Sequence, residues 1–491
     1  MDPRLRTLLF GLAASAVAVW VGITLAMEQR FVATLAAALC AGVLCSWTRG
    51  PLPEAWLLGF LFLGYVIGDR GFAQISPFTN LPLFFSELGL AAALGLTLFR
   101  GALRRELPWR RDWLNGCLLF WLALGSGRIA SDVRAFGFIA LRDFALVYYV
   151  LYFFVAEVLA GHAPSRRVLH GALLGTFALL PLTGTLAVLF PEFFLSHLLV
   201  DGVPLIFYKG DLLATFLFTG YLVLLPAGHG HRARDLGRWA AAVGSLVLGL
   251  TLLSRAPLVG LLVASGWLAL AGRWRPFRVL VAVALAGLLA VTVGSLLQRK
   301  SFTQTKAYAV YEAVVSIGDF SGTRDYQNDL SSNKGDNNRF RIVWWRNVAQ
   351  ETLATAPLLG LGFGADLAHG FLNEYYPTEE PDFSARSPHN VFMTTLGRMG
   401  LVGAAALAGV YFLQGRQTWR TARAARADPG LQPAMTLQAA VWVVMVSACL
   451  GVVLEGPMGA IPFWIMLGLA HQAAHAGEPV TAPLPAGAAA V

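Results

Sequence analysis

Charged residues are scarce in this chain of 491 residues, where Asp, Glu, Lys and Arg together make up only 13%. Soluble domains carry roughly 25% charged residues, so the composition excludes an ordinary soluble protein. Hydrophobic residues make up 56% of the sequence, and apolar runs of 17 or more residues recur along it. Each run approaches the roughly 20 residues that a helix needs to cross the hydrocarbon core of a bilayer. The sequence therefore predicts an integral membrane protein.

Cysteine is also rare. The four cysteines, Cys40, Cys45, Cys117 and Cys449, all lie in apolar runs, and the long polar segment 298–390 contains none. This distribution favours neither a disulfide framework nor a metal cluster. We expect no metal and no cofactor.

The formal net charge is +9, which invites a nucleic-acid interpretation. The cationic residues, however, lie in short loops between apolar runs rather than in one basic patch. This pattern is typical of signals that orient a membrane protein. We expect the lipid bilayer, and no nucleic acid, as the partner of these charges.

Fourteen apolar runs are candidate membrane spans. The predicted fold is an all-α polytopic membrane protein, a bundle of about 12–14 transmembrane helices with one large loop subdomain. The third and fifth runs are short for a complete span. The candidates are Thr7–Met27, Phe31–Trp47, Glu54–Ile67, Leu81–Phe99, Trp113–Ser126, Ala135–Ala160, Val168–Phe190, Pro204–Pro226, Leu236–Leu253, Ala256–Ala271, Phe277–Leu297, Val391–Leu413, Met435–Leu454 and Pro457–Gln472.

The arginines predict how the chain is oriented. With the N-terminus inside, 20 arginines fall in inner loops and only five in short outer loops (Arg30, Arg70, Arg128, Arg134 and Arg255). Loops rich in Lys and Arg stay in the cytoplasm. We therefore expect a multi-pass protein of the bacterial inner membrane, with both termini in the cytoplasm and the long polar segment in the periplasm.

The predicted organisation has four parts: N-terminal transmembrane helices (1–297), a periplasmic loop subdomain (298–390), C-terminal transmembrane helices (391–475) and a disordered cytoplasmic tail rich in Ala and Pro (476–491). Within the loop, the polar stretch 318–338 is predicted to be mobile. Residues 339–356 have the apolar spacing of an amphipathic helix near the membrane surface. Pro357 and the glycines after it are expected to end that helix.

His389 stands where the polar segment meets the apolar run Val391–Leu413. A neutral imidazole accepts a proton near pH 7, so it suits the activation of a hydroxyl group. A histidine that only caps the next helix is the structural alternative.

Arginines near the outer face are candidates for binding an anion. Arg255 follows Ser254 in a tight turn between two apolar runs, and a guanidinium there could clamp a phosphate or only anchor lipid headgroups. Arg142 lies inside an apolar run, where a charge usually faces a cavity or a partner. Asp143 points about 100° away from it on a helix, so we expect Arg142 to face another anion.

Arg339 and Arg341 precede Trp344-Trp345 in the predicted amphipathic helix. The tryptophans could hold the helix at the headgroup level and place the arginines over a lipid phosphate, and a solvated helix face is an equal alternative. Lys209 and Asp211 are charged residues within the eighth apolar run. They indicate a cavity or a partner as Arg142 does, but more weakly.

Two other patterns are weaker. The glycine string within residues 360–364 lacks the βαβ context of a nucleotide site, and that interpretation is rejected. The acidic group within residues 379–382 could hold a divalent cation, but an ordinary acidic turn is the better interpretation.

The order of these motifs resembles the bacterial O-antigen ligase and O-antigen polymerase superfamily. The resemblance covers roughly residues 135 to 470 and departs from the family in two respects. The Pro-Asn pair common before the span that begins near Gly210 is missing, and fourteen spans exceed the usual 12. The motifs are residues 252–255, 341–345, 357–364, 389–390, Gly397, 400–403, 455–457 and 462–464.

The resemblance implies a metal-independent membrane glycosyltransferase, with His389 as general base and Arg255 and Arg341 as diphosphate-binding residues. Arg339 competes with Arg341 for that match, and Arg142 is a further candidate. The implied donor is an undecaprenyl-diphosphate-linked glycan. The acceptor is lipid A–core in a ligase, which we favour, or another carrier-linked glycan in an O-antigen or exopolysaccharide polymerase.

Two other classes stay open from the sequence. A polysaccharide transporter would need paired broken helices at the membrane midplane, and no strong pair is visible. A scaffold without catalysis would tolerate the loss of His389.

Overall fold

The computed structural model describes residues 50–76, 84–105, 107–225, 232–297, 329–375 and 386–475, together with Tyr308, Tyr311, Glu312 and Val315. The predicted spans Thr7–Met27 and Phe31–Trp47 and the predicted tail 476–491 lie outside the described residues. So does the acidic group at 379–382.

The described chain is almost entirely helical. The helices are α3 (Pro53–Leu63), η1 (Gly64–Gly68), α4 (Arg70–Gln74), α5 (Phe85–Arg104), α6 (Trp113–Phe136), α7 (Ile139–Tyr148), α8 (Leu151–Gly161), α9 (Ala163–Leu189), η2 (Phe193–His197), α10 (Gly210–Leu224), α11 (Arg232–Thr251), α12 (Arg255–Leu270), α13 (Arg275–Leu297), α15 (Asp329–Thr355), α16 (His369–Tyr375), α17 (Val391–Ala427), η4 (Pro429–Leu431), α18 (Gln432–Ala448) and α19 (Pro457–Ala474). Strands β1 (Leu199–Val200) and β2 (Val203–Pro204) form a small antiparallel hairpin.

Six segments of the described chain are long and apolar enough to cross a membrane: Phe85–Arg104, Ile139–Gly161, Ala163–Leu189, Arg275–Gly294, Val391–Ala427 and Pro429–Ala448. Shorter apolar helices occupy Pro53–Gly68, Gly210–Leu224 and Arg255–Leu270. The predicted all-α polytopic membrane fold is confirmed.

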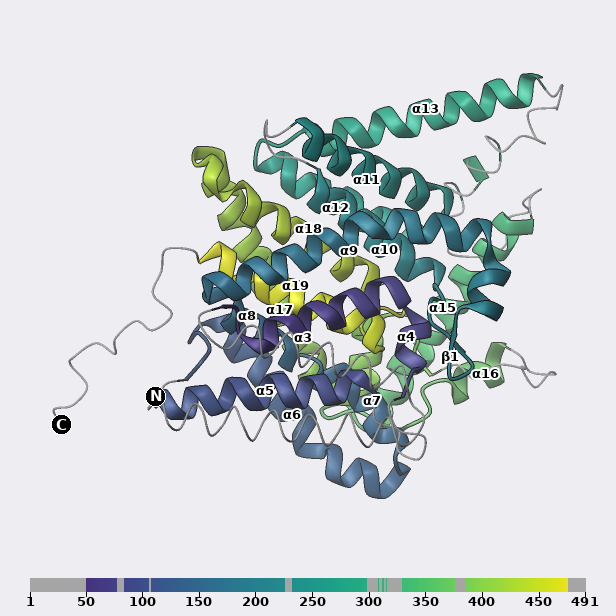
Figure 1. Cartoon of the computed structure of the whole chain (residues 1–491). Coiled ribbons are helices and arrows are strands. Elements are labelled where there is room, and N and C mark those ends of the chain that lie inside the picture. Colours follow the sequence, from purple (N-terminus) through teal and green to yellow (C-terminus); the bar gives the residue numbers. More distant parts are fainter. Residues whose placement is uncertain are drawn as a thin grey trace.

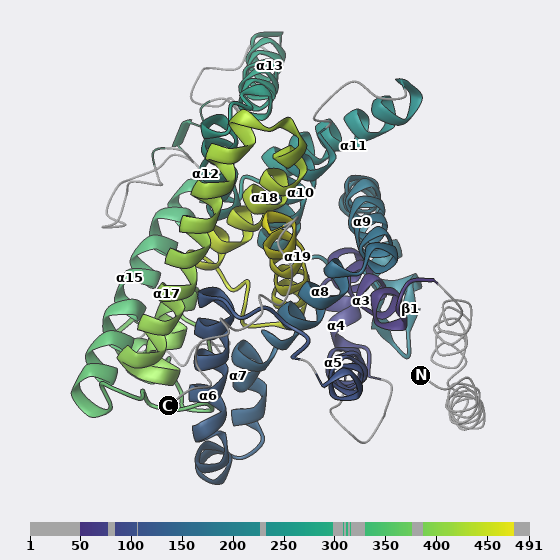
Figure 2. The same ribbon diagram turned by 90° about the vertical axis from the view of Figure 1, so that its left-hand side faces the viewer.

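The long helices run broadly in one direction, with α13 along one edge of the bundle (Figure 1). Helices α15 and α16 and strand β1 gather at one end of it, on the right in Figure 1. Figure 2 shows α15 and α17 lying side by side, and these two helices are in contact. The main apolar core joins the transmembrane helices, and a smaller cluster around Trp344 and Phe371 holds α15 and α16 together.

Two helices extend beyond the ends of the predicted apolar spans, because the polar residues that follow are also helical. Helix α6 runs past Ser126 to Phe136, and Arg128 pairs with Asp132 one turn later, Nε to Oδ2 at 2.8 Å. Helix α17 continues past Leu413 to Ala427. Helix α15, likewise, begins at Asp329 instead of Arg339, within the stretch that was expected to be mobile.

Helix α17 is broken at Gly400, whose φ of 66° lies in the left-handed region. The loop after α15 enters this break: the amide of Leu401 donates to the carbonyl of Pro357 at 2.8 Å, and the amide of Leu361 donates to the carbonyl of Gly397 at 2.7 Å. A Cβ at Gly400 would lie 2.3 Å from the carbonyl oxygen of Leu358. The glycine therefore permits the close approach that fixes the loop beside the start of α17.

Candidate active site at the start of α17

His389 is held at the amino end of α17 by backbone geometry. Its φ of 56° lies in the left-handed region, which histidine, asparagine and aspartate adopt more readily than most residues. The next residue, Asn390, caps the helix: its Oδ1 accepts from the amides of Phe392 at 2.8 Å and Met393 at 3.2 Å. Because Asn390 caps the helix, the side chain of His389 is not used for capping.

Aromatic side chains of α15 form one wall around the half-buried imidazole. Its ring centroid lies 5.9 Å from that of Trp344 and 6.5 Å from that of Phe340, both edge to face. The indole Nε1 of Trp345 donates to the carbonyl of Pro388 at 2.6 Å. His389 Nδ1 is buried and has no hydrogen-bond partner among the described residues, so one ring nitrogen is left without a partner.

Two cations share the site with His389. Burial, together with the charges of Arg341 and Lys209, lowers the pKa of the imidazole to about 4, while the charge of Asp211 opposes the shift. His389 is therefore neutral at pH 7 and able to accept a proton.

Arg341, and not Arg339, faces this site. Burial lowers the pKa of Arg341, and the charge of Asp211 opposes the shift. The Nε of Arg341 is buried without a partner among the described residues. Arg339 is exposed, and its guanidinium lies 5.8 Å from the centroid of the Tyr375 ring. Arg341 therefore carries an unused buried donor.

Lys209 and Asp211 link the starts of other helices to the site. The Nζ of Lys209 lies 3.5 Å from the carbonyl oxygen of Val452. The Oδ1 of Asp211 accepts from the hydroxyl of Ser254 at 2.8 Å, and Arg255 is the first residue of α12. The structure thus brings the start of α12, where Arg255 lies, next to Asp211, and the diphosphate-binding role of Arg255 stays a prediction.

An isolated β-bridge between Asp69 and Phe207 holds Lys209 in place. Its backbone amide donates to Oδ2 of Asp69 at 2.8 Å, and the amide of Arg70 donates to the carbonyl of Phe207 at 3.1 Å. Asp69 has a φ of 49° and bridges to Phe207. The end of η1 therefore positions the ammonium group at the start of α10.

Glu455 is a site residue to which the sequence gave no role. Its carboxylate accepts from the hydroxyls of Ser387 at 2.9 Å and Thr394 at 3.1 Å, and from the amide of Val453 at 3.0 Å. Burial raises its pKa, while these donors and the charge of Lys209 oppose the shift. Its position in the motif 455–457 was the signal that could have pointed to it.

Residues 240–408 match the protein-family model described as O-antigen ligase. This match confirms the resemblance to the ligase and polymerase superfamily. No curated protein matches the chain. The match supports an enzyme of the ligase or polymerase group, which implies glycan or lipid substrates and a membrane environment.

The matched residues include Arg255, Arg341 and His389, whereas Lys209 and Glu455 lie outside them. The candidate site combines elements inside and outside the matched residues. The starts of α12 and α17 and one face of α15 lie inside, whereas the start of α10 and the connection between α18 and α19 lie outside.

Arg142, like Arg339, is a predicted site residue that no contact within the described chain joins to His389. The side chain of Arg142 is exposed, and no hydrogen bond or ion pair within the described chain joins it to the site. The neighbouring Asp143 faces inward instead, with Oδ2 at 2.8 Å from Nη2 of both Arg386 and Arg398. The diphosphate-binding role of Arg142 stays a prediction, since α7 turns the carboxylate of Asp143, and not the guanidinium of Arg142, toward the protein.

The glycine string within residues 360–364 is held by these charges. The amide of Gly364 donates to Oδ2 of Asp143 at 3.0 Å, and the amide of Phe363 donates to Oδ2 of Asp132 at 2.8 Å. Arg398, only 2% exposed, reaches the carbonyls of Gly362 and Ala365. The motif therefore has a structural function, in agreement with the rejection of a nucleotide site.

Asp143→Asn is expected to destabilise the protein, because Arg398 would stay buried without its anion. Removing one partner of a buried ion pair costs about 3–5 kcal/mol. The thermal midpoint of the purified variant should therefore fall by several degrees. The control is Asp201→Asn, an exposed residue at positive φ, which should leave the midpoint unchanged. Equal midpoints for Asp143→Asn and wild type would contradict a stabilising role of the ion pairs of Asp143 with Arg386 and Arg398.

Proposed function

We propose that this enzyme transfers a glycan from undecaprenyl diphosphate to an acceptor hydroxyl at the periplasmic face of the inner membrane, without a metal. The acceptor that we favour is lipid A–core. The observation that carries the proposal is the convergence of a neutral His389, with an unpartnered Nδ1, and the cations Arg341 and Lys209.

In the proposed reaction, His389 accepts the proton of the acceptor hydroxyl as its oxygen attacks the anomeric carbon. A new glycosidic C–O bond forms, and the bond between that carbon and the diphosphate oxygen breaks with inversion. Negative charge grows on the leaving diphosphate. Arg341, Arg255 and Lys209 stabilise it, and fixed cations are most effective in such a water-poor site.

The donor itself is expected to tune the base. In the free protein Arg341 and Lys209 hold the pKa of His389 low, at about 4. A bound diphosphate offsets both charges, and a nearby anion favours the protonated imidazole. The pKa therefore moves toward the working pH when donor is bound, where general base catalysis is strongest. His389 becomes an effective base only in the donor complex.

The alternative is a polymerase, whose acceptor hydroxyl belongs to a second carrier-linked glycan. The family match covers both activities, and the same site would serve either acceptor. The deciding experiment supplies purified enzyme with carrier-linked glycan and either lipid A–core or no second acceptor. Product on lipid A–core supports the ligase, whereas lengthened carrier-linked glycan supports the polymerase. Absence of both products, with donor bound, contradicts the proposed transfer and leaves a scaffold or transporter.

The orientation has its own prediction, motivated by the distribution of arginines. A cysteine at Ser331 should react with a membrane-impermeant thiol reagent in intact spheroplasts, whereas a cysteine at Ala424 should react only after lysis. The wild-type chain, with its four native cysteines, gives the background labelling. The reverse pattern would place the site in the cytoplasm and exclude a periplasmic reaction.

A further inference from the structure

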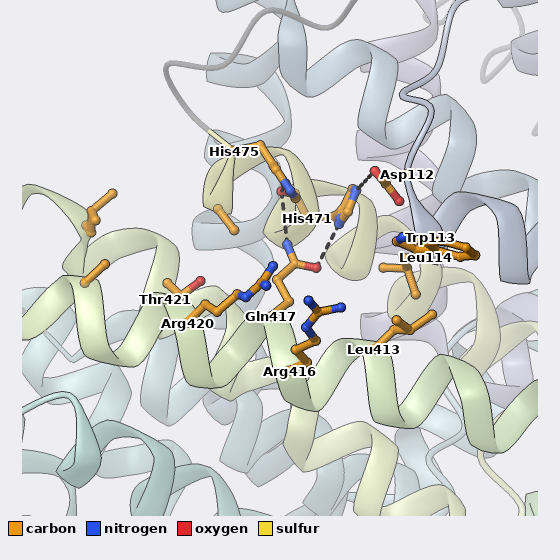
Figure 3. Close-up of a pocket in the computed structure, with 13 residues that line it drawn as sticks. Asp112, Trp113, Leu114, Leu413, Arg416, Gln417, Arg420, Thr421, His471 and His475 are labelled. Atoms are coloured by element: carbon orange, nitrogen blue, oxygen red, sulfur yellow. Dashed lines mark hydrogen bonds and ion pairs between the residues drawn. The ribbon is translucent and has the colours of Figure 1, made fainter. Parts of the chain in front are cut away.

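A second polar cavity, of about 290 Å³, lies at the other end of α17 (Figure 3). Its lining residue Arg416 follows Val391 by 25 positions in α17. Arg416 lies 16 residues beyond the break at Gly400, which is roughly 24 Å along the second part of α17 at 1.5 Å per residue. The cavity is therefore separate from the site at His389. Its lining residues are Asp112, Trp113, Leu114, Leu413, Arg416, Gln417, Arg420, Thr421, Ala424, Leu431, His471, Ala474 and His475.

The cavity has an excess of positive charge. Arg416 and Arg420 lie one turn apart on α17, where residues share a face, and Figure 3 shows them on the side of the helix that carries Gln417. Neither arginine has an acidic partner within the described residues. Asp112 is the one carboxylate of the lining, and its Oδ2 lies 2.8 Å from Nε2 of His471. The two guanidinium groups are therefore available to an anion.

The back of the cavity is ordered by hydrogen bonds. His471 Nδ1 lies 2.9 Å from Oε1 of Gln417, whose Nε2 donates to the carbonyl of His471 at 3.4 Å. The other ring nitrogen of His471, Nε2, faces Asp112 and, at 3.3 Å, Glu157. The cavity thus has a fixed polar wall.

The same acidic cluster could be considered as a metal site, because the ligating atoms of Asp112, Glu157 and His471 lie within 4.8 Å of one another. The 2.8 Å contact between Asp112 and His471 has the length of a hydrogen bond. Glu157 also accepts from Asn115 Nδ2 at 3.0 Å. Hydrogen bonding accounts for this cluster, and we do not assign a metal to it.

The lining also has an apolar part, beside the polar residues Thr421 and His475. Leu114, Leu413 and Leu431 line the cavity, and Trp113 at its edge is 79% exposed. Exposed tryptophan next to arginine is typical of the boundary between acyl chains and headgroups. Cationic and apolar surfaces therefore meet in one cavity at the end of membrane-spanning helices.

We propose that this cavity binds the phosphate group of an anionic phospholipid, with Arg416 and Arg420 on the phosphate and the leucines along the first part of the acyl chains. This site goes beyond the glycan transfer proposed above and does not depend on it. Paired guanidinium groups suit the oxygen atoms of a phosphate through charge-assisted hydrogen bonds.

The test measures binding to the full chain purified in detergent. The probes are dioctanoyl phosphatidylglycerol, dioctanoyl phosphatidylcholine and inorganic phosphate. The anionic lipid should bind at least about tenfold more tightly than the zwitterionic lipid. The double variant Arg416→Gln/Arg420→Gln should weaken that binding at least about tenfold, because each hydrogen bond to a charged group contributes roughly 1.5–3 kcal/mol.

Arg423→Gln is the matched control, since Arg423 is also exposed on α17 but does not line the cavity. It should change the affinity by less than about twofold, which is below the contribution of one such hydrogen bond. Melting temperatures without lipid establish that the variants are folded, and Arg420→Gln alone replaces the double variant if that one is not. Unchanged lipid affinity in the double variant would overturn the site. Inorganic phosphate that binds as tightly as the lipid, and competes with it, would overturn the lipid as its source.

Discussion

His389→Ala is expected to slow glycan transfer at least about a hundredfold, because a general base contributes roughly 10²–10⁴-fold in rate. The expectation follows from a neutral imidazole whose Nδ1 is buried without a partner in the described structure. Donor binding should persist, since Arg341 and Lys209 are unchanged. Transfer by purified protein in detergent and binding of the carrier-linked donor are the two measurements.

His389→Asn separates catalysis from structure. Asparagine tolerates the left-handed backbone found at position 389 and keeps hydrogen bonding, but it has no basic nitrogen. This variant should melt near the wild-type temperature and still transfer nearly as slowly as His389→Ala. Wild-type turnover by His389→Asn would end the assignment of His389 as base and leave only the cations to explain catalysis.

The overall fold could be predicted from the sequence because apolar run length is a strong signal. Helix ends could not be predicted as well. The pattern of α6 loses its apolar character at Arg128, yet the helix continues, since Arg128 and Asp132 satisfy each other and the glycine loop. Such compensation depends on residues more than 200 positions away, which no local pattern contains.

Part of the candidate site could be proposed from the sequence, and its roles stay predictions. His389 and Arg255 stand out because each lies at the boundary of an apolar run, and Arg341 because it precedes Trp344-Trp345 in the polar segment. Which side chain of the pair Arg142 and Asp143 faces the protein depends on the rotation of α7 about its axis. In the folded chain Asp143 faces inward and pairs with the buried Arg398. The role of Glu455 depends on the hydroxyls of Ser387 and Thr394, brought together only by folding.

Arg341→Gln is expected to lower transfer roughly 10²–10³-fold, the effect of removing one group that stabilises charge in a transition state. Two features of the structure support a direct role: its Nε is buried without a partner among the described residues, and its charge acts on His389. Arg339→Gln is the matched control on the same helix. Arg339 is exposed over Tyr375, so its loss should change the rate little.

The dependence of kcat/KM on pH distinguishes this role of Arg341 from a structural one. In the wild type, activity should be lost as the pH falls through the pKa of His389 at about 4, because only the neutral imidazole accepts a proton. Removing the positive charge at position 341 raises that pKa, and the acid limb should move upward but stay below the ordinary value of 6.5, since burial persists. Arg341→Lys keeps the positive charge but loses the bidentate geometry of the guanidinium. The transfer rate of this variant should therefore fall, while the acid limb of its pH profile stays in place. Equal acid limbs in the Gln and Lys variants would contradict the electrostatic coupling of Arg341 to His389.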